Sequence, residues 1–185
     1  MLSDIQICCT VETDLPAITA IYAEAVATGL GSYESEAPDL VEMTRRWRNR
    51  VSSGHPYIVA IADGEIVGFS YAGRFRTRPA YRFLVEDSIF VAANARGMGV
   101  GRELLAELIR LCEEKGYRQM IALIAGGTDN LPSVGLHDRL GFRQIGLIEG
   151  CAFKQGRWID TLLMQRALGE GRNSLNPELR RAPFP

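Results

Sequence analysis

RGMGVG, residues 96–101, lies between an apolar stretch at 83–91 that predicts a strand and a leucine-rich stretch that predicts a helix. The start of a helix presents unpaired backbone N–H groups and the positive end of its dipole, and both favour a bound phosphate. Glycines let the backbone approach a pyrophosphate without obstruction by side chains. The segment therefore predicts a diphosphate-binding turn; the alternative is a tight turn that binds nothing.

Two common nucleotide-binding motifs do not match this turn. No Lys-Ser or Lys-Thr pair follows the glycines, which excludes the phosphate-binding loop of nucleotide hydrolases. The spacing of Gly97, Gly99 and Gly101 also differs from the dinucleotide-binding pattern, and the turn does not open a repeated βαβ unit.

The segments on either side of the turn predict a mixed α/β domain, because strands alternate with helices after an early hairpin around Asp63-Gly64. We expect one domain over residues 1–168 and a polar, mobile tail over 169–185. Four helices are predicted: one after Asp14, one after Asp39, one that ends at Gly116, and one over 131–140. The helix after Asp39 has an apolar face formed by Leu40, Met43, Trp47 and Val51. The other predicted strands are 5–9, 120–125, about 142–148 and about 158–167.

Composition narrows the classes of partner. A formal net charge of −1 provides no general attraction to nucleic acid or to an anionic membrane, and no apolar run approaches a membrane span. The first residues do not resemble a signal peptide, and four cysteines are too few for a disulfide framework, so we expect reduced thiols in the cytoplasm. Two histidines and no CxxC pair do not predict a metal site.

Arg96-x-x-Gly99-x-Gly101 resembles the coenzyme A pyrophosphate loop of the GCN5-related N-acetyltransferase superfamily. Further segments match in order and narrow the resemblance, which covers roughly residues 3–168, to the phosphinothricin and methionine sulfoximine acetyltransferase branch. It implies a mostly antiparallel sheet that splays at its fourth strand, acetyl-coenzyme A as cosubstrate, and a homodimer. The matching segments are Arg78–Tyr81, Val85-Glu86, Ile89–Val91, Asn130-x-x-Ser133, His137, Leu140–Phe142 and Phe153–Asp160.

The resemblance also implies which residues contact the coenzyme. The strand before the turn is expected to act through its backbone, binding the pantetheine arm and offering an N–H group to the developing oxyanion. The connection before Asn130 is longer than usual for the superfamily. The implied coenzyme-binding residues are Ile89, Phe90, Val91, Arg96, Gly97, Met98, Gly99, Val100, Gly101, Asn130 and Ser133.

Glu86 is the candidate general base for removing a proton from the substrate amine, whose pKa near 10 leaves it mostly protonated at neutral pH. Its apolar strand predicts a carboxyl pKa raised by desolvation. Asp87 must point to the opposite face, and strand alternation alone does not say which of the two faces the site. The resemblance favours Glu86; the alternative is an ordinary solvated or ion-paired carboxylate.

His137 is the candidate proton donor to the leaving thiolate, at a position where many members of the superfamily carry a tyrosine. An imidazolium donates a proton readily to a thiolate, whose conjugate acid has a pKa near 8.5. The alternative is a histidine that only packs or contacts the coenzyme.

Four arginines within nine residues (Arg74, Arg76, Arg78 and Arg82) predict a clamp for a carboxylate or phosphinate, because guanidinium groups pair with such anions in bidentate fashion. The alternative is a solvated loop. The preferred members of this clamp are Arg78, Tyr81 and Arg82. By resemblance, Tyr33 is a further candidate substrate-binding residue, an aromatic side chain that lines the substrate mouth.

Together these features predict direct transfer of an acetyl group to the α-amine of a small amino acid or analogue within a ternary complex, since no cysteine lies in a Cys-His arrangement. One alternative is acetylation of a polyamine, an aminoglycoside or a protein N-terminus. Another is a coenzyme A-binding sensor without activity.

Overall fold

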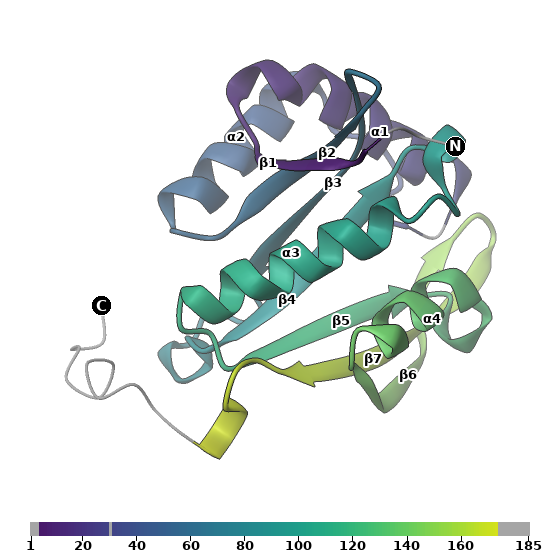
Figure 1. Cartoon of the computed structure of the whole chain (residues 1–185). Helices are drawn as coiled ribbons and strands as arrows, with labels where there is room; N and C mark the ends of the chain where they lie inside the picture. Colours follow the sequence, from purple (N-terminus) through teal and green to yellow (C-terminus); the bar gives the residue numbers. More distant parts are fainter. Residues whose placement is uncertain (1–3, 30, 174–185) are drawn as a thin grey trace.

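The computed structural model describes residues 4–29 and 31–173, which form one seven-stranded sheet with helices on both faces (Figure 1). The strand order is β1-β2-β3-β4-β5-β7-β6, and every neighbouring pair is antiparallel except β4 and β5. The strands are β1 Gln6–Cys9, β2 Tyr57–Ala62, β3 Glu65–Arg74, β4 Leu84–Val91, β5 Gln119–Ala125, β6 Arg143–Lys154 and β7 Arg157–Ala167; the helices are α1 Leu15–Thr28, α2 Leu40–Ser52, α3 Val100–Glu114 and α4 Leu131–Arg139.

Most predicted elements are confirmed to within a few residues, because their local signals are strong. Asp63 and Gly64 adopt the positive φ values, 52° and 80°, that a tight hairpin turn requires. The Asp39 carboxylate accepts a hydrogen bond from the Glu42 N–H at 2.8 Å and so caps α2. Gly116, at φ 83°, follows the end of α3 as a left-handed residue.

Three predictions about element details differ from the structure. Strand β6 extends to Lys154, well beyond the predicted end, because it pairs with β7 along nearly its whole length. In α2 only Met43 is buried, whereas Leu40 and Val51 are 43% and 45% exposed, because these two residues lie at the ends of the helix. Residues 171–173 form a short 3-10 turn, and the rest of the predicted mobile tail lies outside the described residues.

Two apolar cores lie on opposite faces of the sheet. One joins α3 and α4 to alternate strand residues such as Val85 and Ala122, and the other joins α1 and α2 to their neighbours, such as Phe69 and Phe90. Since both faces are covered at the centre of the sheet, side chains on either face of the central strands are shielded from water, whereas most residues of the edge strands β1 and β6 are exposed. None of the described helices is long and apolar enough to cross a bilayer.

The sheet opens between β4 and β5. These two strands run parallel and pair only from Leu84 to Glu86, whereas β4 pairs with β3 as far as Val91. Beyond Glu86 the two strands separate towards α4 (Figure 1). The predicted splay at the fourth strand is therefore confirmed, and its apex lies at Glu86.

Candidate active site

Glu86 and Asp87 project from opposite faces of β4 at the apex of the splay. Glu86 lies opposite Gly73 of β3 and beside Ile121 of β5, on the face that α1 and α2 cover. Asp87 is only 7% exposed and lies on the face that α3 and α4 cover. The structure thus shows which face of the sheet each carboxylate takes, which strand alternation alone does not.

The carboxyl group of Glu86 is half-buried, and its surroundings shift its pKa. Burial, and after it the charge of Asp87, raise the pKa of Glu86 above its ordinary value, while the charges of Arg50 and Arg76 oppose the shift. A carboxylate with a raised pKa is a stronger base than a solvated one. This environment fits the role predicted for Glu86.

His137 projects from α4 into the core and is 4% exposed. Its Nδ1 lies 2.7 Å from the Ser133 carbonyl oxygen, and its Nε2 lies 3.1 Å from Asp87 Oδ2. Burial by itself lowers the pKa of His137, but the hydrogen bond to Asp87 and the charge of that carboxylate outweigh burial, so the pKa is raised. Because two acceptors face the ring, the doubly protonated form satisfies both contacts.

The backbone of β4 beyond the apex points alternately towards β3 and towards the splay. The N–H of Ala92 donates to the Val67 carbonyl of β3 at 3.0 Å, so Phe90, two residues earlier, also faces β3. Ile89 and Val91 therefore direct their N–H and C=O groups into the splay. The side chain of Phe90 is buried in the α1–α2 core, and its backbone faces the neighbouring strand β3 and not the splay, unlike the backbone groups of Ile89 and Val91.

The RGMGVG segment has the geometry of an anion-binding helix start. Gly97 and Gly99 adopt positive φ values of 75° and 91°, and a side chain at either position would meet no atom within 4 Å. The N–H groups of Arg102 and Glu103 both donate to the Gly99 carbonyl. The amides just before them, including that of Gly101, begin the helix without an intrahelical acceptor.

The other residues of the segment have distinct positions. The Arg96 guanidinium donates to the Val91 carbonyl at 3.1 Å and pairs with Glu24 at 3.2 Å, so it ties the turn to the end of β4. The side chain of Val100 is buried, which leaves only its backbone for a ligand, while Met98 is 50% exposed.

Asn130 is the N-cap of α4. Its side-chain oxygen accepts a hydrogen bond from the Ser133 N–H at 3.4 Å, and its amide nitrogen donates to the Ala125 carbonyl at 3.0 Å. The extra residues of the preceding connection are accommodated by two left-handed glycines, Gly126 and Gly127. Asn130 and Ser133 thus shape the start of the helix that carries His137.

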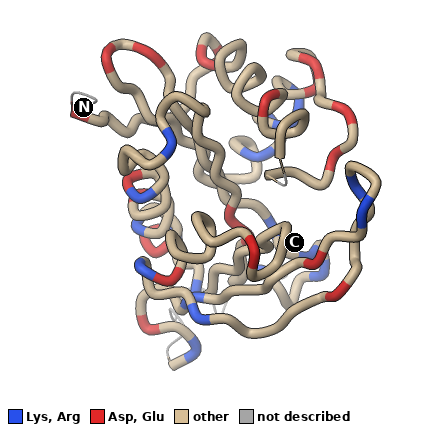
Figure 2. The backbone as a smooth tube through the Cα atoms, turned by 90° about the vertical axis from the view of Figure 1, so that its right-hand side faces the viewer, with Lys and Arg blue, Asp and Glu red and all other residues tan. Residues whose placement is uncertain are grey.

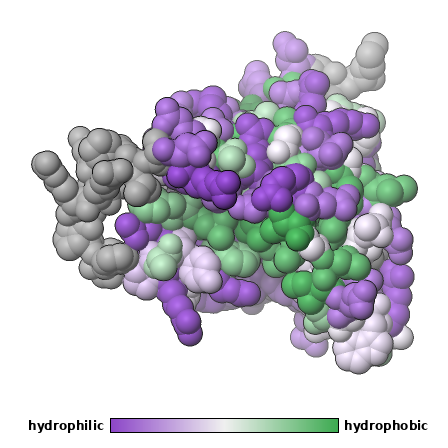
Figure 3. All heavy atoms as spheres, turned by 90° about the horizontal axis from the view of Figure 1, so that it is seen from below, coloured by the Kyte–Doolittle hydropathy of each residue, from purple (hydrophilic) through white to green (hydrophobic). Residues whose placement is uncertain are grey.

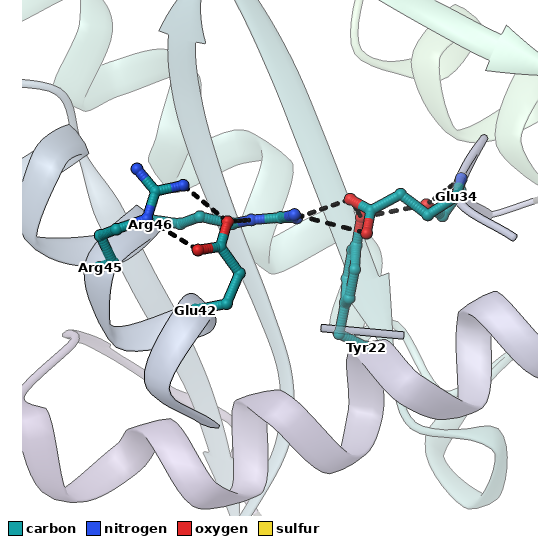
Figure 4. A network of polar contacts seen from close by, with 6 residues as sticks. Tyr22, Glu34, Glu42, Arg45 and Arg46 are labelled. Atoms are coloured by element: carbon teal, nitrogen blue, oxygen red, sulfur yellow. Dashed lines mark hydrogen bonds and ion pairs between the residues drawn. The ribbon is translucent and has the colours of Figure 1, made fainter. Parts of the chain in front are cut away.

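The connection between α1 and α2 is held in place by a polar network (Figure 4). Arg46 of α2 pairs with Glu34 at 2.6 Å and with Glu42 at 2.7 Å. The Tyr22 hydroxyl donates to Glu34 at 2.9 Å and contacts the Ser32 hydroxyl at 3.0 Å. Lys154, the last residue of β6, also binds this connection.

Lys154 is 8% exposed and donates to the carbonyl oxygens of Gly29 and Ser32, at 3.1 and 2.8 Å. With the connection fixed from two sides, Tyr33 reaches across the sheet, and its hydroxyl contacts the Thr161 hydroxyl of β7. Burial raises the pKa of Tyr33, and the charge of Glu86 contributes to that shift. The predicted aromatic residue therefore lies on the same face as the candidate base.

The arginine-rich loop lines a depression formed by Arg74, Arg76, Thr77, Arg78, Pro79 and Arg82. Arg78 precedes a short 3-10 turn, Pro79–Tyr81, and is exposed. The ring of Tyr81 packs edge-to-face on Phe75, with centroids 5.9 Å apart. The Arg82 guanidinium stacks over the Phe83 ring at 4.4 Å and donates to the Pro79 carbonyl at 3.5 Å. Arg78 and Arg82 thus line this depression, the arginine-lined mouth, whereas Tyr81 is not among its lining residues.

Sequence reasoning missed one residue of this site. Arg50 of α2 and Arg76 of the loop both act on the pKa of Glu86. Arg76 belongs to the arginine cluster that predicts the clamp, although it is not among the preferred substrate-binding residues, whereas Arg50 was assigned no role. Arg50 is one of several charged residues on α2, and no local signal distinguishes it.

Acidic and basic residues are interspersed along the backbone (Figure 2). Local arrangements of charge, such as the arginine loop, therefore determine which ligands the protein attracts.

The known proteins that this chain resembles are acetyltransferases. The family model of the acetyltransferase (GNAT) family matches residues 18–142. The chain is 49% identical over 171 residues to phosphinothricin N-acetyltransferase of Alcaligenes faecalis, covering 90% of this chain and 86% of the relative. It is 36% identical to the L-methionine sulfoximine/L-methionine sulfone acetyltransferase of Pseudomonas aeruginosa, covering 87% and 93% of the two chains.

A solved structure resembles the fold along almost its whole length. It is that of a GNAT superfamily phosphinothricin acetyltransferase from Sinorhizobium meliloti in complex with AcCoA. The two structures align with a TM-score of 0.91 at 45% sequence identity, and the alignment covers 95% of each chain.

Proposed function

This chain belongs to the acetyltransferase (GNAT) family and is an acetyl-CoA-dependent N-acetyltransferase, and from this premise we propose that it acetylates the α-amine of a small anionic amino acid or analogue. Phosphinothricin and methionine sulfoximine represent the proposed substrate class. The observation that carries this proposal is the position of Glu86, which lies at the apex of the splay and within the electrostatic influence of Arg50 and Arg76.

The chain's own residues suit the binding of the cosubstrate. We propose that the amides at the start of α3 hold its diphosphate, with Gly97 and Gly99 keeping the approach free of side chains. Ile89 and Val91 then offer backbone groups to the pantetheine arm in the splay. This arrangement would place the thioester at the apex, beside Glu86.

In the proposed reaction, the carboxylate of Glu86 accepts a proton from the substrate ammonium group. The neutral amine nitrogen then bonds to the thioester carbonyl carbon and becomes positively charged. That nitrogen releases its second proton to water, and the carbon–sulfur bond breaks as the tetrahedral intermediate collapses to the amide. A backbone N–H of β4 that faces the splay stabilises the oxyanion of that intermediate. No covalent acetyl-enzyme forms on this route.

The departing thiolate takes up a proton, and we propose that His137 supplies it from Nε2. That nitrogen is held by Asp87, on the face of the sheet opposite Glu86. The two proton transfers would then take place on opposite sides of the apex. The alternative role for His137 is packing that holds α4 to β4. The activity of His137→Leu distinguishes the two roles.

A panel assay of amines with acetyl-CoA, with detection of the released thiol, tests the substrate class. We expect phosphinothricin and methionine sulfoximine to give the highest kcat/KM, because a cationic polyamine or aminoglycoside would be repelled by the arginine-lined mouth. Equal or higher kcat/KM with spermidine, an aminoglycoside or a peptide N-terminus would refute the substrate class. If no amine led to release of thiol, the result would favour the alternative of a coenzyme A-binding sensor without activity.

We propose that the protein works as a homodimer in the cytoplasm. Strand β6 is an edge of the sheet and exposes Ile145, Leu147 and Ile148 at 39–44%, and Trp158 of β7 is 69% exposed. Hydrophobic residues gather on the face of the molecule seen from below (Figure 3). An exposed apolar edge strand favours association with a second copy. Sedimentation should report a dimer that Leu147→Glu converts to a monomer, and a monomeric wild type would refute the proposal.

A further inference from the structure

Arg50 differs from the other arginines of α2 in having no acidic partner. Arg45 pairs with Glu42, Arg46 with Glu42 and Glu34, and Arg48 with Glu12. Within residues 4–29 and 31–173 no ion pair is formed by Arg50. Its half-buried guanidinium instead lies 4.1 Å from the centroid of the Tyr71 ring. A partly desolvated guanidinium without a carboxylate is open to an anionic ligand.

The position of Arg50 is defined by a glycine. A β-carbon added to Gly73 would lie 3.3 Å from Arg50 Nη1, so the guanidinium occupies the space that a side chain on β3 would fill. Gly73 is directly opposite Glu86 in the β3–β4 register. Side chains at directly opposed positions have β-carbons about 5 Å apart. The guanidinium therefore lies within one side-chain length of the candidate base.

Glu86 and Arg50 are close but do not pair directly. The charge of Arg50 lowers the pKa of Glu86, so their charges interact, yet no ion pair joins these two described residues. In an α-amino acid the amine and a carboxylate are attached to the same carbon atom. A ligand whose ammonium group faces Glu86 would thus carry its carboxylate to the guanidinium beside that base.

We propose that Arg50 is a substrate-binding residue that holds the carboxylate next to the reacting amine, while the arginine loop holds the second anionic group of the side chain. This inference rests on the proposed function. The Tyr71 ring lies against the guanidinium carbon, and no carboxylate of the described residues pairs with the guanidinium N–H groups, so they are available for bidentate pairing with a ligand. The two anion sites would make the enzyme favour α-amino acids with an acidic or phosphinate side chain over simple amines.

The test compares phosphinothricin with the amine that lacks only its α-carboxylate. Arg50→Met keeps an unbranched side chain and removes the guanidinium with its charge. We expect it to raise KM for phosphinothricin about 10-fold to 100-fold, the range for a charge-assisted pair, and to leave KM for the decarboxylated amine within about twofold. Arg78→Ala should raise KM for both compounds, because both retain the phosphinate.

Two further variants keep the result interpretable. Gly73→Ala adds a methyl group in contact with the guanidinium and should raise KM for phosphinothricin selectively, even if Arg50→Met folds poorly. Arg45 is an exposed arginine on the same helix that pairs with Glu42, so Arg45→Ala is the matched control. It should leave KM unchanged for phosphinothricin and for the decarboxylated amine.

An equal change of KM for both compounds in Arg50→Met and in Gly73→Ala would overturn the assignment of Arg50. That outcome is distinct from failure of the proposed function, in which the wild-type protein would acetylate neither compound.

Discussion

Replacing His137 with leucine should destabilise the protein strongly, because it leaves the buried carboxylate of Asp87 without its hydrogen-bond partner. The side chains of His137 and Asp87 are 5% and 3% exposed and lie 3.1 Å apart. Asp87 Oδ1 already has no hydrogen-bond partner among the described residues, so the imidazole is the main compensation for this charge. Removing one partner of a buried ion pair costs about 3–5 kcal/mol of unfolding free energy.

Unfolding experiments on four proteins measure this cost: the wild type, His137→Leu, Asp87→Asn and the double variant. In a chain of this size, 3–5 kcal/mol corresponds to a fall in Tm of about 6–20 °C for His137→Leu. The double variant should regain part of that loss, because a neutral amide is cheaper to bury than a carboxylate. The substitutions should therefore be non-additive.

A loss below about 1 kcal/mol for His137→Leu, or strictly additive losses, would refute the reasoning, since it requires a charged and coupled pair. The same variant tests the catalytic proposal. If kcat stays within about twofold of the wild type at a temperature where His137→Leu is folded, His137 is not the proton donor and serves packing alone.

Three catalytic or binding predictions and one on stability follow from the same site. Glu86→Gln should lower kcat/KM about 10²–10⁴-fold at pH 7 and much less at pH 9.5, where the amine loses its proton unaided; equal losses at both pH values would argue against a base. Gly99→Val should weaken acetyl-CoA binding in calorimetry, whereas Gly64→Val, at a similar positive φ of 80° but in the β2–β3 hairpin, should not; unchanged affinity would reject the diphosphate turn. Arg78→Ala should raise KM for an anionic amino acid about tenfold while kcat changes little, and an unchanged KM would contradict the clamp. Because the pKa of His137 is raised on folding, its stabilisation is complete below about pH 6.5 and is lost as pH rises through the folded pKa; urea unfolding should show this decline in the wild type and not in His137→Leu, and a flat wild-type profile would contradict it.

Local sequence signals determined most of the element order and the diphosphate turn. The hairpin follows from two residues that tolerate positive φ, and α3 follows from leucines at helical spacing between a glycine-rich start and Gly116. Each signal acts through the backbone or through near neighbours in the chain, so it can be identified without the fold. The limits of α2's buried face and of β6 depended on distant contacts, and these predictions were wrong in detail.

The sequence by itself determined that Glu86 and Asp87 lie on opposite faces of one strand, because side chains alternate along a strand. Only the tertiary structure decided which face each one takes, since both faces of this sheet are covered and apolar neighbours surround both residues. The same holds for the pairing of Asp87 with His137, 50 residues away, and for the position of Arg50 over Gly73. These contacts join segments that meet only when the sheet and its helices pack together.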